Sequence, residues 1–190
     1  MTDTAPEERP LDDQVRHERR DGVAWITLNR PEAHNAVTPD QRNRVISLLE
    51  DASGDLAVRC VVITATGKGF CTGADLRARR DEVIRPEGAP ERAIGDVSRM
   101  IRDGAQRLMT AVLDCEKPVI AAVNGTAAGI GAHLAFSCDL VIAAERASFT
   151  EVFVRRGLVP DGGGAYLLPR LIGLQKTKEL LFFGDKLSAT

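Results

Sequence analysis

The stretch from Val119 to His133 constrains the fold of this chain most, because an apolar run gives way to small residues and then to a helical pattern. Residues 119–123 have the composition of a buried β-strand, and Asn124-Gly125 follows directly. Glycines at positions 129 and 131 allow the backbone to turn tightly and to approach other groups closely. A strand that breaks into glycines at a helix start leaves main-chain N–H groups without partners, and such groups can stabilise a developing negative charge.

A second glycine-containing turn follows another apolar run. Residues 60–65 form a continuous apolar segment of the kind that is buried on both faces in a parallel sheet, and the turn then spans Thr66 to Asp75. Two such turns predict a site in which two main-chain amides stabilise the same oxygen atom.

The composition predicts one soluble domain. The chain has 190 residues, of which 44% are hydrophobic and 27% charged, and its net charge of −2 gives no reason to expect a nucleic-acid partner. No apolar stretch reaches the roughly 18 residues of a membrane span. Residues 1–20 mix acidic, basic and proline residues and are predicted to be a disordered N-terminal tail, with residues 21–190 as the core. The three histidines and four cysteines lack metal-ligand spacing, so we expect no metal site, free thiols and a cytoplasmic location.

Strand and helix patterns alternate along the core, which predicts an α/β class with parallel strands. The predicted strands are 23–29, 60–65, 118–123 and 140–144. Helices are expected after the cap at Thr38-Pro39, over 97–115, over 129–137, and after Gly164 with an interruption at Pro169. The charged residues 77–95 are predicted to form a mobile loop.

Five motifs, in register and in the family's order, resemble the enoyl-CoA hydratase/isomerase family, also called the crotonase family. They are Leu28-Asn-Arg-Pro-Glu-Ala-His-Asn-Ala36, Gly69-Phe-Cys-Thr-Gly-Ala-Asp-Leu76, Pro118-Val-Ile-Ala-Ala-Val-Asn-Gly125, Cys138-Asp-Leu140 and Gly157-Leu-Val-Pro-Asp-Gly-Gly-Gly164. The resemblance implies the crotonase spiral of ββα units, an acyl-CoA thioester as ligand with no separate cofactor, and a homotrimer or dimer of trimers. Family chains usually continue further, so we expect the C-terminal helical part to be missing here.

The resemblance also assigns site residues. The main-chain amides of Ala74 and Ile130 align with the family's two oxyanion-hole donors. The residues that fall where the family holds the adenine and pantetheine of coenzyme A are Glu32, Ala33, His34, Thr72, Asp75 and Leu76.

This chain departs from the family's hydratases at the two positions where they carry catalytic carboxylates, which are His133 and Phe153 here. Glu151 precedes Phe153 by two residues, so on an extended segment it would lie about 6–7 Å away on the same face, and a surface charge is its other interpretation. Asp161 aligns with the carboxylate of several family isomerases. We expect it to move a proton between carbons, with His133 orienting substrate or polarising water. Capping of the next helix is the alternative for Asp161, and a satisfied, half-buried imidazole is the alternative for His133.

The function predicted from these residues is double-bond isomerisation on an acyl-CoA. Hydration with non-standard residues is one alternative. A catalytically silent acyl-CoA-binding or assembly protein is another, and the missing carboxylates favour it.

Overall fold

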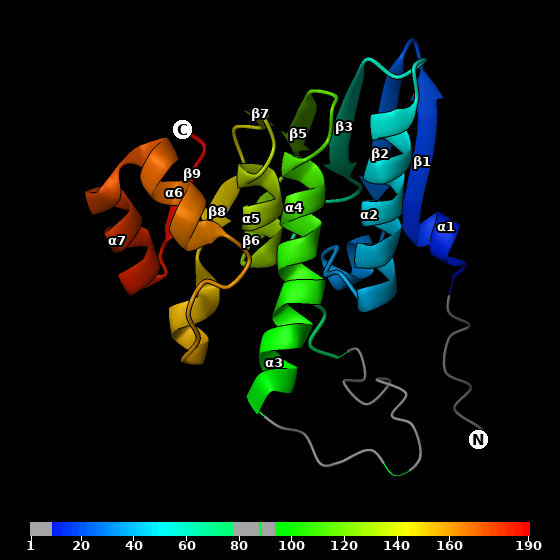
Figure 1. The fold of residues 1–190 in the computed structure, drawn as a ribbon. Helices are drawn as coiled ribbons and strands as arrows, with labels where there is room; N and C mark the ends of the chain where they lie inside the picture. Colours follow the sequence, from blue (N-terminus) through cyan, green and yellow to red (C-terminus); the bar gives the residue numbers. More distant parts are fainter. Residues whose placement is uncertain (1–8, 78–87, 89–93) are drawn as a thin grey trace, which may run out of the picture.

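The computed structural model describes residues 9–77, 88 and 94–190, and its strands form two sheets (Figure 1). The larger sheet has the order β1-β2-β3-β5-β7, with β1 at Val15–Arg20, β2 at Val23–Leu28, β3 at Cys60–Ala65, β5 at Val119–Val123 and β7 at Leu140–Ala143. The smaller sheet has the order β4-β6-β8-β9, with β4 at Gly69–Cys71, β6 at Thr126–Ala128, β8 at Ser148–Thr150 and β9 at Lys186–Ser188.

The helices lie beside and between these sheets. They are α1 (Leu11–Gln14), η1 (Pro31–Ala33), α2 (Pro39–Gly54), α3 (Ile94–Ile101), η2 (Arg102–Gln106), α4 (Arg107–Leu113), α5 (Ile130–Phe136), η3 (Val152–Arg156), α6 (Gly164–Ile172) and α7 (Leu174–Phe183). In Figure 1, α2 and α4 cover one face of the larger sheet, and α6 and α7 lie at the end away from β1.

Parallel pairing dominates both sheets, as the alternation of strands and helices predicted. Strands β2, β3, β5 and β7 are parallel neighbours, and so are β4, β6 and β8. The alternate residues of β2 and β3 that face the helices, Ile26 and Ile63 among them, are fully buried against Ile46 and Leu49 of α2. The four predicted strands and the α/β class are therefore confirmed.

The start of α2 is fixed by the predicted cap and by a buried polar network. Thr38 accepts a hydrogen bond from the Gln41 amide, and the Gln41 side chain accepts one from the Thr38 amide, which makes a complete capping box. The Gln41 side chain also donates to Gln14 and accepts from Arg30. One glutamine thus connects the helix cap to two other segments of the chain.

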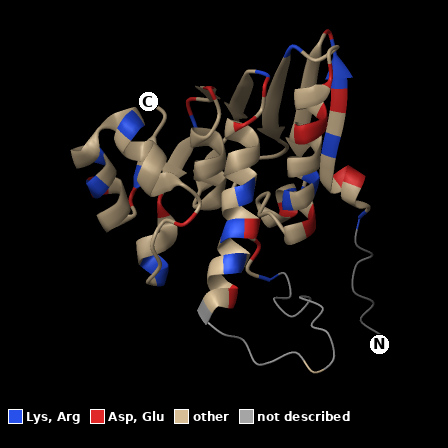
Figure 2. Ribbon diagram, in the orientation of Figure 1, with Lys and Arg blue, Asp and Glu red and all other residues tan. Residues whose placement is uncertain are grey.

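The prediction of a disordered tail over residues 1–20 is wrong for its second half. Residues 11–14 form α1, and all six residues of β1 pair antiparallel with β2. Val15 is fully buried, whereas the rest of β1 carries charges of both signs at the sheet edge (Figure 2). Charged residues on an edge strand discourage pairing with other chains, so a charged segment here is compatible with a strand. Residues 1–8 lie outside the described residues.

Two details of the helices also differ from expectation. The helix predicted over 97–115 contains a π-helical segment, η2, between α3 and α4. Pro169 does not end α6, which continues to Ile172 and stops at Gly173. Most of the predicted mobile loop, residues 78–87 and 89–93, lies outside the described residues.

Candidate functional site

Two glycine-containing turns leave the same edge of the smaller sheet, because β4 and β6 are parallel neighbours in it. The first turn runs from β4 through Gly73 to Ala74, and the second runs from β6 through Gly129 to Ile130. Gly73 and Gly129 have φ values of 105° and 53°, which L-amino acids rarely adopt. A methyl group on Gly73 would lie 3.7 Å from the Ile130 amide nitrogen, so the two turns are in close contact.

The amides of Ala74 and Ile130 have no hydrogen-bond acceptor within the part of the chain that the structure describes. Val37 donates to the carbonyl of Gly73 and accepts from the amide of Asp75. Because successive residues of an extended segment point their N–H groups to opposite sides, the Ala74 amide faces away from Val37. Ile130 is the first residue of α5, where N–H groups have no partner in the helix. Both donors are available to a ligand.

The structure brings together the segment at residues 32–34 and Thr72, which the sequence had grouped. The carbonyl of His34 accepts hydrogen bonds from the Thr72 amide at 3.3 Å and from the Thr72 hydroxyl at 3.2 Å. Ala33 is buried, while Glu32 and His34 are exposed. Glu32 forms an ion pair with Arg9 at 2.5 Å. This segment therefore forms a wall next to the first turn.

Asp75 lies at the end of this turn, and only 4% of its side chain is exposed. Its carboxylate accepts from Arg30 at 3.1 Å and from the Arg77 side chain at 3.2 Å. Burial works against ionisation, but the hydrogen bonds from Arg77 and Arg30 outweigh it and hold the pKa of Asp75 below its ordinary value. Arg30 also contacts Gln41, so the network at the start of α2 reaches the first turn. Leu76 is 59% exposed.

Asp161 lies in the turn between η3 and α6. Its side chain is half-buried, and its Oδ1 atom is buried without a hydrogen-bond partner in the described part of the chain. Its carbonyl accepts a hydrogen bond from the Gln106 side chain at 3.0 Å. The N-cap of α6 is Gly163, with no side-chain capping bond, so capping does not account for Asp161.

His133 and Glu151 form a buried pair that sequence reasoning missed. The His133 Nε2 atom lies 3.1 Å from Glu151 Oε2, and the two side chains are 0% and 2% exposed. The ring of Phe153 stacks on His133 with a centroid separation of 5.1 Å. The interpretation of Glu151 as a surface charge is wrong, because Glu151 follows β8 directly and points at α5. The local sequence Ser148-Phe-Thr-Glu151 carries no apolar run that would indicate this burial.

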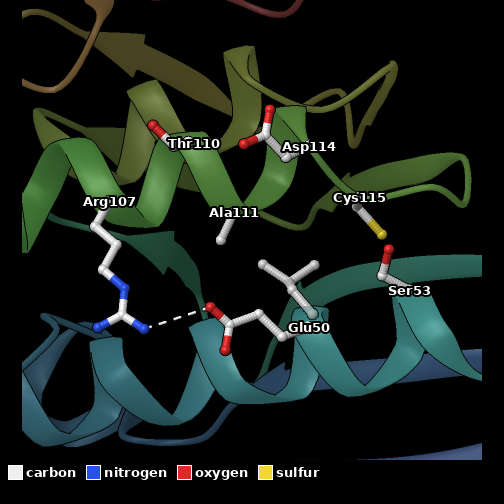
Figure 3. Close-up of a pocket in the computed structure, with 8 residues that line it drawn as sticks. Glu50, Ser53, Arg107, Thr110, Ala111, Asp114 and Cys115 are labelled. Atoms are coloured by element: carbon white, nitrogen blue, oxygen red, sulfur yellow. Dashed lines mark hydrogen bonds and ion pairs between the residues drawn. The ribbon is translucent and has the colours of Figure 1, made fainter.

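The described residues also line a groove between α2 and α4 of about 260 Å³, with the Glu50–Arg107 ion pair across it (Figure 3). Ser53 and Cys115 lie at its other end. None of the predicted site residues lines this groove. It is therefore separate from the two turns.

Comparison with known proteins decides the family. The family profile described as enoyl-CoA hydratase/isomerase matches residues 18–190. The chain belongs to this family.

Curated relatives and solved structures agree with this family. A protein of Rhodobacter capsulatus named probable enoyl-CoA hydratase is 39% identical over 92% of this chain and 63% of its own length. The 1,2-epoxyphenylacetyl-CoA isomerase of Escherichia coli is 40% identical over 88% of this chain and 62% of its own length. The crystal structure of an enoyl-CoA hydratase from Bacillus anthracis superposes with a TM-score of 0.81 at 32% identity, over 93% of this chain and 65% of that one. The predicted crotonase fold is confirmed, and the chain spans somewhat less than two thirds of these relatives.

Among the described residues, every helix is too short or too polar to span a lipid bilayer. These residues also contain no group of three or more His, Cys, Asp or Glu side chains that could hold a metal ion.

Proposed function

We propose that this enoyl-CoA hydratase/isomerase family member isomerises the double bond of an acyl-CoA, with Asp161 as acid and base. Asp161 removes a proton from the carbon next to the thioester of a 3-enoyl-CoA and returns it two carbons further on. The negative charge in between resides on the thioester oxygen, which accepts hydrogen bonds from the Ala74 and Ile130 amides. The substrate and product are isomers, so no water or external oxidant is consumed.

The observation that carries this proposal is the buried, unpartnered Oδ1 of Asp161. A carboxylate oxygen with no partner costs free energy unless a ligand uses it, and capping does not use it. Glu151 Oε1 and His133 Nδ1 are also buried without a partner, but their side chains are 2% and 0% exposed, whereas Asp161 is half-buried and can be reached by a ligand. The close contact of the two turns supports the oxyanion hole, because it brings two unpaired amides to one edge of the smaller sheet.

The chemistry around His133 supports isomerisation over hydration. A family hydratase would place carboxylates at positions 133 and 153 to handle water. Here these positions hold an imidazole bonded to Glu151 and the phenyl ring stacked on it. Both side chains are buried within the protein, so neither presents a base to a water molecule. The E. coli relative is named an isomerase of an epoxide and the R. capsulatus relative a probable hydratase, so the names of these two relatives favour neither reaction.

The remaining predictions concern ligand and assembly. The wall at residues 32–34 with Thr72 would contact coenzyme A, and Leu76 is exposed beside it. The Asp75 carboxylate is engaged by two arginines, so its part in binding would be to hold the turn rather than to bond the ligand. A homotrimer or dimer of trimers and a cytoplasmic location stay predictions.

The test follows the absorbance of the conjugated thioester after mixing the protein with a 3-enoyl-CoA or with crotonyl-CoA. We expect conjugated product from the 3-enoyl-CoA, and a fall in kcat of about 10²- to 10⁴-fold in Asp161→Asn. Asp114→Asn, an exposed aspartate at the end of α4, is the matched control and should keep the activity.

Each other outcome points to a different function. Rapid loss of the crotonyl-CoA absorbance, unaffected by Asp161→Asn, would establish hydration instead. Binding of both thioesters with no turnover would establish the silent acyl-CoA-binding protein.

A further inference from the structure

The His133 imidazole is enclosed on every side by groups that fix its position. Its side chain is fully buried, Glu151 contacts Nε2 at 3.1 Å, and Phe153 stacks on the ring with an interplanar angle of 14°. The contact between Nε2 and the Glu151 carboxyl group is a hydrogen bond. The ring is therefore held in one orientation.

The turn that follows Asp161 packs directly on this ring. A methyl group on Gly162 would lie 2.8 Å from His133 Nδ1, and one on Gly164 would collide with Nε2. Neither glycine has a positive φ, so the backbone at both positions would accept other residues. Contact with the imidazole is what requires glycine at positions 162 and 164.

Asp161 is held from a second direction by the π-helical segment η2. Gln106 donates to the Asp161 carbonyl at 3.0 Å, and a methyl group on Gly162 would lie 3.8 Å from the Ala105 side chain. Gln106 is the last residue of this π-helical segment, which places the hydrogen-bond donor at the junction between η2 and α4. The backbone of Asp161 is thus fixed between η2 and the imidazole.

We propose that His133 and Glu151 are a positioning pair that holds the Asp161 turn at the distance from the thioester that proton transfer requires. This inference rests on the proposed function, in which Asp161 is the acid and base. The pair acts through packing, because the fully buried imidazole lies against the glycines of this turn. A misplacement of about 1 Å in a reacting group can lower a rate by about 10²-fold, so a rigid support matters.

The first experiment adds one methyl group at the contact. Gly162→Ala forces the turn away from His133, so we expect kcat to fall by about 10-fold or more while KM changes by less than about 3-fold. Gly54→Ala is the matched control, because it adds the same methyl group at the end of α2 with no atom within 4 Å. Hydrogen exchange of the peptides that cover residues 157–166, measured without substrate, should rise in Gly162→Ala and not in Gly54→Ala.

The second experiment removes the imidazole ring with which the added methyl group collides. In a His133→Ala background the ring is gone, so adding Gly162→Ala should cost no further kcat and no further protection from exchange. If the two substitutions acted independently, their effects on kcat and on exchange, expressed as free energies, would add in the double variant. Additive losses, or wild-type kcat and exchange in Gly162→Ala, would overturn the proposal.

The third experiment uses Glu151 and does not depend on whether Gly162→Ala folds. Glu151→Gln keeps a side-chain amide that can form the hydrogen bond to Nε2, so it should retain most of the kcat that Glu151→Ala loses. Equal losses in both variants would contradict a positioning role through this hydrogen bond. If Asp161→Asn retains full activity, the proposed function fails, and the exchange data alone then decide whether the pair holds the turn.

Discussion

In the proposed function, Ile130 contributes to the candidate site through its amide and not through its side chain. It is the first residue of α5, where proline is well tolerated because the N–H group has no partner in the helix. Ile130→Pro removes this donor and puts a methylene in its place. We expect kcat to fall by about 10²- to 10³-fold, the usual cost of losing one oxyanion-hole donor.

Ile130→Ala is the control for the loss of the side chain, since it keeps the amide. Circular dichroism should show equal helix content in both variants. Equal kcat in the two variants would rule out the Ile130 amide as a donor to the thioester.

Cys71 precedes the first turn and is fully buried, which raises the pKa of its thiol to about 11. The folded protein therefore keeps this proton at a pH where the unfolded chain, with a value near 9.0, has lost it. The stabilisation is complete below pH 9 and disappears as the pH rises to about 11. Urea unfolding at several pH values should show this decline, with a smaller slope in Cys71→Ala. Identical slopes would contradict the assignment.

The elements of this protein differ in how well the sequence predicts them. Strands β2, β3 and β5 follow from apolar runs and alternation, because their inward residues must be buried for the sheet to form. Strand β1 could not be predicted in this way, because its single buried valine among charged residues is too weak a pattern. It is a strand because it pairs with β2.

The candidate site also contains features that the sequence predicts and features that it does not. The two turns that carry the Ala74 and Ile130 amides could be located from glycines and the family's motifs, since turns are encoded locally. The contact between His133 and Glu151 could not, because the two residues are joined only when β8 and α5 pack together. The π-helical segment η2 was not predicted either; the Arg42 side chain of α2 lies against its Gly104, a contact between segments far apart in the sequence.

The capping box of α2 gives a prediction at the scale of one helix. Thr38→Ala removes the hydroxyl that accepts from the Gln41 amide, so the free energy of unfolding should fall by about 1 kcal/mol. Thr38→Ser keeps the hydroxyl and should remain close to the wild type. Chemical denaturation measures both, and an unchanged Thr38→Ala would contradict a contribution of this cap.

Helices α6 and α7 form one end of the molecule (Figure 1). Several of their apolar side chains are exposed. Leu174, Phe182 and Phe183 of α7 are 58%, 65% and 64% exposed. Exposed apolar patches favour association, so we expect this chain to bind a hydrophobic dye and to form oligomers. The double substitution Phe182→Ser, Phe183→Ser should reduce both.

Leu56 provides the control for that experiment. It is 95% exposed but lies in the connection between α2 and β3, far along the chain from α7. Leu56→Ser should leave dye binding and light scattering unchanged. An equal effect of both substitutions would show that general surface polarity, and not the α7 face, controls association.

The network through Gln14, Gln41, Arg30 and Asp75 has a consequence for engineering this protein. Each of these side chains forms a hydrogen bond with the next, so a change at one position leaves a polar group of another without its partner. Mutant libraries that sample these positions separately should yield few functional clones. Joint randomisation of all four, with selection for turnover, should recover combinations that no series of single steps would reach.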